Sequence, residues 1–341
     1  MMYNRKKNCY ISPINVNIEV TEKCDLNCKF CFKKSDGLKE IDFILLCRYL
    51  DQLAELGTPA IQFSGGDPLL YSYLIPAIRY AHAKGFYIRM STSGKTFSLS
   101  YAGELKQAGL DTLHVSLNGS TESIHSETRD GFNYSIKAID IAHQMNMLCV
   151  INWVANHSNV HDLENLIIIA KEMGVKRIDI LSNKRNYDGQ LSHPMTIEDT
   201  QYLKEVCEKY DDYVSVESCY NELRLLLYGR SISIIDKACK AGRFHMAIDV
   251  QGKLLPCPHL AQYAKDEKDI KSYWANDLTL LKFRQACRNG TSNDLLNMYS
   301  DSCVFCKNKS VCFPCYANCD NSIRDSVTFN CLLQSDYYQL A

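Results

Sequence analysis

Near the start of the chain stand three closely spaced cysteines, Cys24, Cys28 and Cys31. Soft thiolate ligands select zinc, copper(I) or iron–sulfur clusters, and a structural zinc site normally closes with four protein ligands. No fourth cysteine or histidine lies near these three in the sequence. Three thiols without a fourth therefore indicate an iron–sulfur cluster in which one iron is left open for chemistry.

Alternating strands and helices must position this cysteine loop. A period-two apolar pattern predicts a strand directly before the loop, and further strands follow, each separated from the next by a helical pattern. The predicted strands cover residues 14–20, 60–63, 87–91, 112–117, 147–154 and 177–181. The predicted helices cover residues 40–56, 71–84, 100–108, 134–144, 162–173 and 196–210. This alternation predicts an α/β fold with a parallel sheet, a partial (β/α)6 TIM-like barrel whose chemistry lies at the C-terminal strand ends.

The spacing of the three cysteines, with Phe30 before the last of them, resembles the signature loop of the radical S-adenosylmethionine (SAM) enzymes. The resemblance implies that Cys24, Cys28 and Cys31 hold a 4Fe-4S cluster and that its open iron chelates the amino and carboxylate groups of SAM. It also implies that Phe30 supports the adenine. An electron from the cluster would then split SAM into methionine and a 5′-deoxyadenosyl radical.

Polar and glycine residues at the other strand ends extend this resemblance. The segment around Gly65, Gly66 and Asp67 resembles the family's Gly-Gly-Glu-Pro motif, with aspartate in place of glutamate. The resemblance implies that its backbone carbonyls accept hydrogen bonds from the SAM ammonium group, and that Ser116 contacts the carboxylate region. These residue types are also ordinary turn formers. The expected cofactor-binding set is Phe30, Gly65, Gly66, Asp67, Ser116, Asn152 and Arg185.

A second group of cysteines lies in the last third of the chain. Its members are Cys239, Cys257, Cys303, Cys306, Cys312, Cys315, Cys319 and Cys331. These thiols suffice for two four-thiolate sites, and their spacing alone leaves structural zinc and iron–sulfur clusters both open. Residues 246–255, between the first two cysteines, predict a β-hairpin with a tight turn at Gln251-Gly252.

The order and spacing of these cysteines resemble the SPASM domain, which occurs on radical SAM enzymes that modify peptides and proteins. The resemblance implies two auxiliary 4Fe-4S clusters, three clusters in all, with the auxiliary pair fully ligated by protein and acting as electron acceptors. The first auxiliary cluster is expected to take Cys239, Cys257, Cys315 and Cys319. The second is expected to take Cys303, Cys306, Cys312 and Cys331. Most of the remaining cysteines, which include Cys219, are expected to pack as small hydrophobic residues.

The expected domain organisation follows from these assignments. We expect the radical SAM partial barrel at 1–210, a linking helical segment at 211–237, and the SPASM auxiliary-cluster domain at 238–341. Lys plus Arg (38) and Asp plus Glu (39) nearly cancel, so no global field favours nucleic acid or an anionic membrane. Neither a secretion signal nor an apolar stretch of membrane-spanning length is present. We therefore expect a soluble, cytoplasmic enzyme, in which 17 cysteines indicate cluster ligation and not disulfides.

The leading functional hypothesis is a radical SAM maturase of a ribosomally made peptide. It would abstract a hydrogen atom and install a thioether, carbon–carbon or carbon–oxygen cross-link. His259 is the candidate general base, because some relatives carry an aspartate directly after the cysteine that corresponds to Cys257, where this chain has Pro258. The expected partners are a precursor peptide, an electron donor such as flavodoxin or ferredoxin, and a separate leader-peptide-binding protein, since only about fifteen residues precede the first strand.

Two alternatives remain open at the level of sequence. The chain could oxidise or rearrange a small molecule, such as a sugar or a cofactor precursor. It could also be a non-catalytic binding module stabilised by zinc, since paired cysteines are a common zinc signal.

Overall fold

The computed structural model describes residues 3–4, 6–7, 9–33, 37–228, 239–289 and 315. Within residues 221–222 and 286–289 it describes the backbone only. Several expected cluster ligands fall outside the described residues, so their placement stays a prediction: Cys303, Cys306, Cys312, Cys319 and Cys331.

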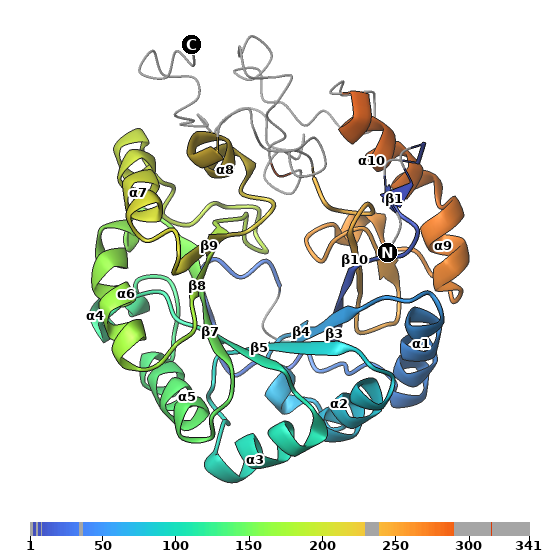
Figure 1. Cartoon of the computed structure of the whole chain (residues 1–341), viewed down its shortest axis with the longest axis horizontal. Helices are drawn as coiled ribbons and strands as arrows, with labels where there is room; N and C mark the ends of the chain where they lie inside the picture. The colour runs from blue at the N-terminus through green and yellow to red at the C-terminus, as the bar shows by residue number, and fades with distance from the viewer. Residues whose placement is uncertain are drawn as a thin grey trace.

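A strongly curved nine-stranded sheet organises the described part of the chain (Figure 1). Its strand order is β11-β10-β3-β4-β5-β6-β7-β8-β9. All neighbours run parallel except the antiparallel pair β10–β11. The strands are β3 (Asn15–Thr21), β4 (Ala60–Gly65), β5 (Tyr87–Thr92), β6 (Thr112–Ser116), β7 (Cys149–Ala155), β8 (Ile178–Ser182), β9 (Val214–Val216), β10 (His245–Ile248) and β11 (Leu254–Leu255). A separate antiparallel pair joins β1 (Tyr3–Asn4) to β2 (Cys9–Tyr10).

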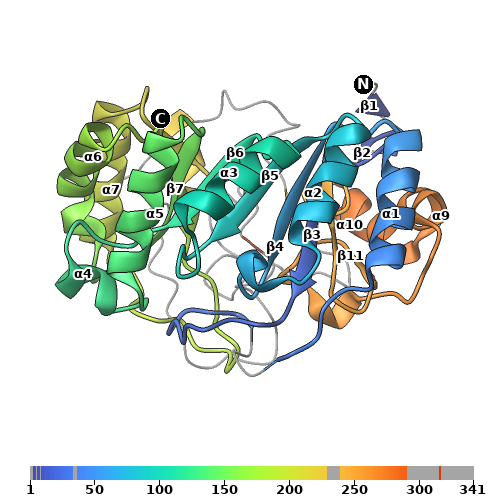
Figure 2. The ribbon, with the colours of Figure 1, turned by 90° about the horizontal axis from the view of Figure 1, so that it is seen from below.

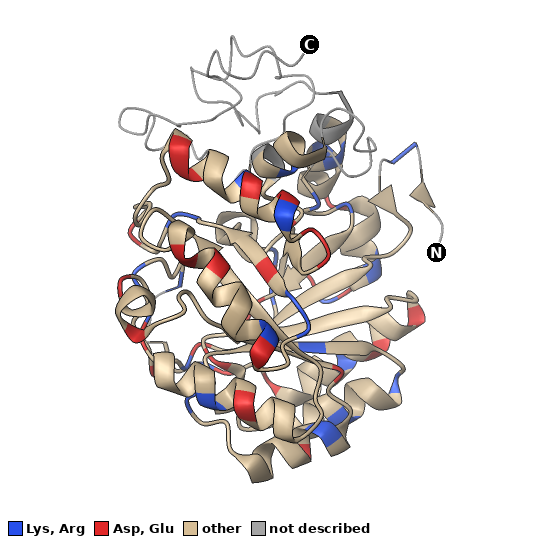
Figure 3. Ribbon diagram, turned by 60° about the vertical axis from the view of Figure 1, so that its left-hand side comes forward, with Lys and Arg blue, Asp and Glu red and all other residues tan. Residues whose placement is uncertain are grey.

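Helices cover the convex side of the sheet, as the two ribbon views show (Figures 1 and 2). They are α1 (Phe43–Glu55), α2 (Leu74–Ala83), α3 (Leu99–Ala108), α4 (Glu122–Ser126), α5 (Phe132–Gln144), α6 (Leu163–Glu172), α7 (Ile197–Lys209), α8 (Asn221–Tyr228), α9 (Ile270–Asn276) and α10 (Leu278–Asn289). Short 3₁₀ turns are η1 (Pro68–Leu70), η2 (Val160–Asp162) and η4 (Ala261–Tyr263). None of the described helices has the length and apolar character needed to cross a bilayer. Acidic and basic residues are interspersed along the outer helices (Figure 3).

Local chemistry explains why the elements start where they do. Val16, Ile18 and Val20 alternate along β3 and are fully buried in the core, as a strand with one face against helices requires. The side chain of Asp42 accepts a hydrogen bond from the backbone N–H of Leu45, at 2.8 Å, and so caps the first turn of α1. Comparable side-chain caps begin α3, α4 and α7. The barrel is therefore specified locally as well as by its core.

The structure confirms the predicted α/β fold and extends it. All six predicted strands and the helices between them are present, and the hairpin predicted at residues 246–255 forms β10 and β11. Two features were not predicted. Strand β9 lies within the segment expected to be a helical link, and β10 pairs in parallel with β3, so that the hairpin continues the sheet of the barrel.

Candidate functional site

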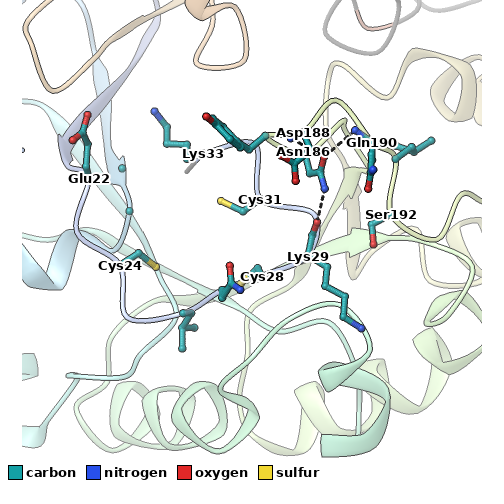
Figure 4. A pocket seen from close by; sticks show the side chains of 16 residues that line it. Glu22, Cys24, Cys28, Lys29, Cys31, Lys33, Asn186, Asp188, Gln190 and Ser192 are labelled. Carbon is teal, nitrogen blue, oxygen red and sulfur yellow. Dashed lines mark hydrogen bonds between the residues drawn. The ribbon is translucent and has the colours of Figure 1, made fainter. Parts of the chain in front are cut away.

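The three cysteines of the first loop line one cavity, into which their sulfur atoms point (Figure 4). The cavity measures about 520 Å³. Burial, the largest cause, raises the pKa of the Cys24 thiol to about 11, and burial likewise raises the pKa of Cys31. Without metal these thiols hold their protons, which they release on binding a metal. The other residues that line the cavity are Glu22, Leu26, Asn27, Lys29, Lys33, Gly65, Gly66, Asn186, Tyr187, Asp188, Gln190, Leu191 and Ser192.

Two glycines hold the end of β4 against the chain that enters the cysteine loop. A Cβ atom on Gly65 would lie 2.2 Å from the carbonyl oxygen of Thr21, and one on Gly66 would lie 2.2 Å from that of Lys23. The same backbone segments are hydrogen-bonded: the Gly66 N–H donates to Thr21 O at 2.7 Å, and the Asp67 N–H donates to Lys23 O at 2.8 Å. Only glycine permits this approach. The predicted Gly-Gly turn therefore lies at the cavity, as expected.

Asp67, which follows the two glycines, is not among the residues that line the cavity. It is buried, and it accepts hydrogen bonds from the Thr92 hydroxyl at 2.7 Å, from the Ser93 hydroxyl at 2.5 Å and from the Ser93 N–H at 3.0 Å. It also accepts a hydrogen bond from the Leu69 N–H at 3.1 Å. The side chain thus ties the end of β4 to the end of β5. The role expected for Asp67 at the cofactor stays a prediction, and its carboxylate supports the glycine turn through these hydrogen bonds.

The loop between α4 and α5, in the connection that follows β6, holds the cysteine loop from another side. The Lys29 N–H donates to Thr128 O at 3.0 Å, and the Asn27 N–H donates to a carboxylate oxygen of Asp130 at 2.9 Å. The guanidinium of Arg129 lies 5.0 Å from the ring centroid of Phe30, a cation–π distance. Phe30, expected to support an adenine, is therefore held against a cation beside the cavity.

The loop after β8 forms the remaining wall and contains contacts that were not predicted. The Asn186 side-chain amide donates to Lys29 O at 3.1 Å, and the Tyr187 N–H donates to Cys31 O at 2.9 Å (Figure 4). Arg185 donates to Gly189 O at 2.8 Å within its own loop, and its predicted contact with the cofactor stays a prediction. The polar run after the sixth predicted strand indicated a functional loop, but not which of its residues reach the cysteines.

Two other predicted cofactor residues do not line this cavity. Ser116 is buried at the end of β6, where its carbonyl accepts a hydrogen bond from the Ser135 hydroxyl at 2.9 Å. The side chain of Asn152, on β7, is hydrogen-bonded to side chains on β6 and β5: its Oδ1 lies 3.1 Å from Nδ1 of His114, and its amide N–H donates to the Ser91 hydroxyl at 3.3 Å. Both positions fit a role in shaping the barrel interior.

A second group of thiols consists of Cys219, Cys239, Cys257 and Cys315. A hydrogen bond between the Cys219 and Cys315 side chains is the largest cause that raises the pKa of Cys219. Burial, followed by the neighbouring thiols of Cys239 and Cys219, raises the pKa of Cys257. Cys219 was expected to pack as a small hydrophobic residue, and the structure corrects this. It precedes the SPASM-like spacing, so the pattern that identified Cys239 and Cys257 could not include it.

The donor sets fit iron–sulfur clusters chemically. Each group consists of thiols, the ligands that such clusters take. No group of three or more His, Cys, Asp or Glu side chains in the described part of the chain is arranged to hold a single metal ion. A four-iron cluster does not require its ligands to converge on one ion, because each thiolate binds a different iron atom.

An aromatic contact connects the two thiol groups. Phe32, next to Cys31, packs on His259 with ring centroids 3.9 Å apart, and Nδ1 of His259 lies 3.9 Å from the sulfur of Cys257. Burial, followed by the charge of Lys184, lowers the pKa of His259 to about 3. The imidazole is therefore neutral near pH 7 and a weak proton acceptor. His259 as a catalytic base stays a prediction that its surroundings do not support.

The chain is similar to several known proteins. Residues 18–168 match the family described as the Radical SAM superfamily. The PqqA peptide cyclase of Bradyrhizobium diazoefficiens is 24% identical over 266 residues, which cover 73% of this chain and 67% of that protein. The AdoMet-dependent heme synthase of Methanosarcina barkeri is 21% identical over 330 residues, which cover 90% of this chain and 92% of that protein. Streptococcus suis SuiB bound to precursor peptide SuiA has a similar fold, with a TM-score of 0.75 at 20% identity over 92% of this chain and 74% of that chain.

Proposed function

We propose that this chain, an enzyme whose residues 18–168 belong to the Radical SAM superfamily, is a maturase that modifies a ribosomally made peptide. The observation that carries the proposal is that the chain contains two groups of thiols. The first set, Cys24, Cys28 and Cys31, has only three thiols and lines a cavity, and the second set has four thiols. Further support comes from similarity to a PqqA peptide cyclase and to SuiB, a fold neighbour solved with a precursor peptide. The proposed modification is a thioether, carbon–carbon or carbon–oxygen cross-link.

The first set has the donors that a SAM-binding 4Fe-4S cluster requires. Cys24, Cys28 and Cys31 would hold the cluster, and the cavity volume of about 520 Å³ falls within the range of about 300–1,000 Å³ typical of cofactor sites. When bound, the cluster and SAM supply a radical that abstracts a hydrogen atom from the substrate. The Gly65–Gly66 turn offers backbone atoms to the cofactor, and the loops after β6 and β8 hold the cysteine loop in place.

The second set would hold one auxiliary 4Fe-4S cluster. We assign it to Cys219, Cys239, Cys257 and Cys315, with Cys219 in place of the expected Cys319. The other auxiliary cluster keeps its predicted ligands, which lie outside the described residues: Cys303, Cys306, Cys312 and Cys331. The proposal therefore still contains three clusters. It also keeps a cytoplasmic location, a flavodoxin or ferredoxin as electron donor, and a separate leader-peptide-binding protein.

Metal analysis and SAM cleavage test the proposal together. Anaerobically reconstituted protein should contain about twelve irons and almost no zinc. Replacing Cys24, Cys28 and Cys31 with alanine should remove about four irons and abolish 5′-deoxyadenosine formation from SAM and dithionite. Cleavage of SAM by this triple variant would refute the assignment of the first set.

A small-molecule substrate is the second candidate, because the similarity to a heme synthase covers 90% of this chain. Peptides encoded beside the gene and porphyrin precursors can be compared as stimulants of 5′-deoxyadenosine formation. Stimulation by peptide alone, with a mass change in that peptide, supports the maturase; stimulation by a porphyrin alone contradicts it. The third alternative, a non-catalytic zinc module, is set aside because the chain is a radical SAM enzyme.

A further inference from the structure

A charged pair occupies the ends of two neighbouring strands. Lys184 lies two residues beyond β8 and Glu217 follows β9 directly, and β8 and β9 are paired at the edge of the sheet (Figure 1). The Lys184 ammonium donates to Oε1 of Glu217 at 2.7 Å, and the two side chains are only 10% and 19% exposed. The same carboxylate oxygen accepts hydrogen bonds from the Ser182 N–H at 2.5 Å and from the Ser182 hydroxyl at 2.7 Å. Both charges are therefore held in fixed positions.

This pair faces the second thiol group. Cys219, two residues after Glu217, forms a side-chain hydrogen bond with the Glu217 carboxylate. The ammonium of Lys184 interacts electrostatically with the sulfurs of Cys219 and Cys315. Lys184 is thus a cation that interacts with this thiol group, and Glu217 is its anchor.

Metal binding changes what the pair must do. Cys219 has to lose its proton to ligate iron, and its hydrogen bond to Glu217 is lost with that proton. The resulting thiolate and the carboxylate repel each other. The positive charge of Lys184 attracts both of these negative groups. Because its ammonium carries three N–H donors, it can donate to Glu217, to the Ser182 carbonyl at 3.4 Å and to a sulfur at the same time.

We propose that Lys184, positioned by Glu217, raises the reduction potential of the auxiliary cluster held by Cys219 and Cys315. The potential of an iron–sulfur cluster depends on nearby net charge, on hydrogen bonds to its sulfurs and on solvent exposure. A fixed, partly buried cation favours the more negative, reduced state of the cluster. The cluster is thereby a better electron acceptor, the role that the proposed function requires of it. This inference rests on the presence of that cluster.

Redox titration followed by electron paramagnetic resonance tests the proposal without substrate. The full chain carrying Cys24→Ala, Cys28→Ala and Cys31→Ala shows only auxiliary clusters. The signal in question is the one that Cys219→Ser alters. In this background Lys184→Gln should shift its midpoint to a more negative potential, and Glu217→Gln should shift it to a more positive one. Lys209→Gln, which removes an exposed ion pair with Glu164 at the end of α7, should leave it unchanged.

The outcomes separate the inference from the function on which it rests. Unchanged midpoints in Lys184→Gln and Glu217→Gln, with the iron content retained, overturn the inference and leave the cluster assignment intact. A parent protein that holds only about four irons, all lost when Cys24, Cys28 and Cys31 are replaced, overturns both. If Lys184→Gln does not retain the cluster, Lys184→Arg and Glu217→Gln are measured in its place. A near-native midpoint in Lys184→Arg together with a more positive midpoint in Glu217→Gln supports the proposal. Any other result overturns it.

Discussion

Gly66→Ala should disable the cysteine loop while leaving the rest of the protein folded. The new Cβ atom would lie 2.2 Å from Lys23 O and 2.6 Å from Glu22 O, both backbone atoms that cannot rotate away. To reach an acceptable contact, the chain entering the loop must move by about 1 Å, a displacement that costs about 100-fold in rate when it misplaces reacting groups. Overpacking of this kind also lowers the free energy of unfolding by about 1–3 kcal/mol.

The assay is 5′-deoxyadenosine formation from SAM and dithionite, with iron content and thermal unfolding measured on the same sample. Gly85→Ala is the matched control: Gly85 has a left-handed backbone, with φ 84°, but no atom lies within 4 Å of the place that a Cβ atom would take there. That control should lose about 1 kcal/mol of stability and keep its SAM cleavage. Gly66→Ala with the wild-type rate of cleavage would show that the close approach of β4 to the loop does not position the first cluster.

Three further predictions concern the residues around the site. Cys219→Ser should lower the iron content by about four per chain without stopping SAM cleavage. The control Cys207→Ser, in the buried core, should leave the iron content unchanged. Equal iron contents in the Cys219 variant and the wild type would reject Cys219 as a ligand. Asp67→Asn should lower the free energy of unfolding by about 1–3 kcal/mol in thermal or urea unfolding, because a charged acceptor of several buried hydrogen bonds is lost; an unchanged midpoint contradicts its tie between β4 and β5. Burial alone would raise the pKa of Asp199, but hydrogen bonds from Thr196 and His157 outweigh it and lower that pKa below 3.8. A carboxylate whose pKa is lowered in the folded state stabilises the protein above its unfolded-state pKa, and this stabilisation is lost as the pH falls through its folded-state pKa. Asp199→Asn should therefore make the free energy of unfolding fall less steeply with pH below about pH 4. A pH profile of stability parallel to that of the wild type would refute this prediction.

Local pattern was sufficient to predict the barrel but not the contacts between distant segments. The apolar alternation of β3 and the glycines at positions 65 and 66 can be recognised from a few neighbouring residues in the sequence. The pairing of β10 with β3 depends on residues more than two hundred positions apart, and a hairpin pattern says nothing about a third strand. Cys219 was missed for the same reason, since only the fold brings it to Cys315. Asp67 was assigned to the cofactor by motif, whereas its hydrogen bonds to the end of β5 become visible only in three dimensions.

The pairing of β10 with β3 explains how the two thiol groups are kept at a fixed separation. Cys24 lies on the loop that leaves β3, and Cys257 follows β11, which pairs with β10. Both groups are therefore attached to one hydrogen-bonded sheet, and the ring contact between Phe32 and His259 joins them a second time. The electron transfer proposed between the two clusters requires a constant, short separation. Placing the hairpin in the barrel sheet favours such a separation, because strand register fixes β10 against β3, and a one-residue slip would turn the buried Met246 and Ile248 out of the core.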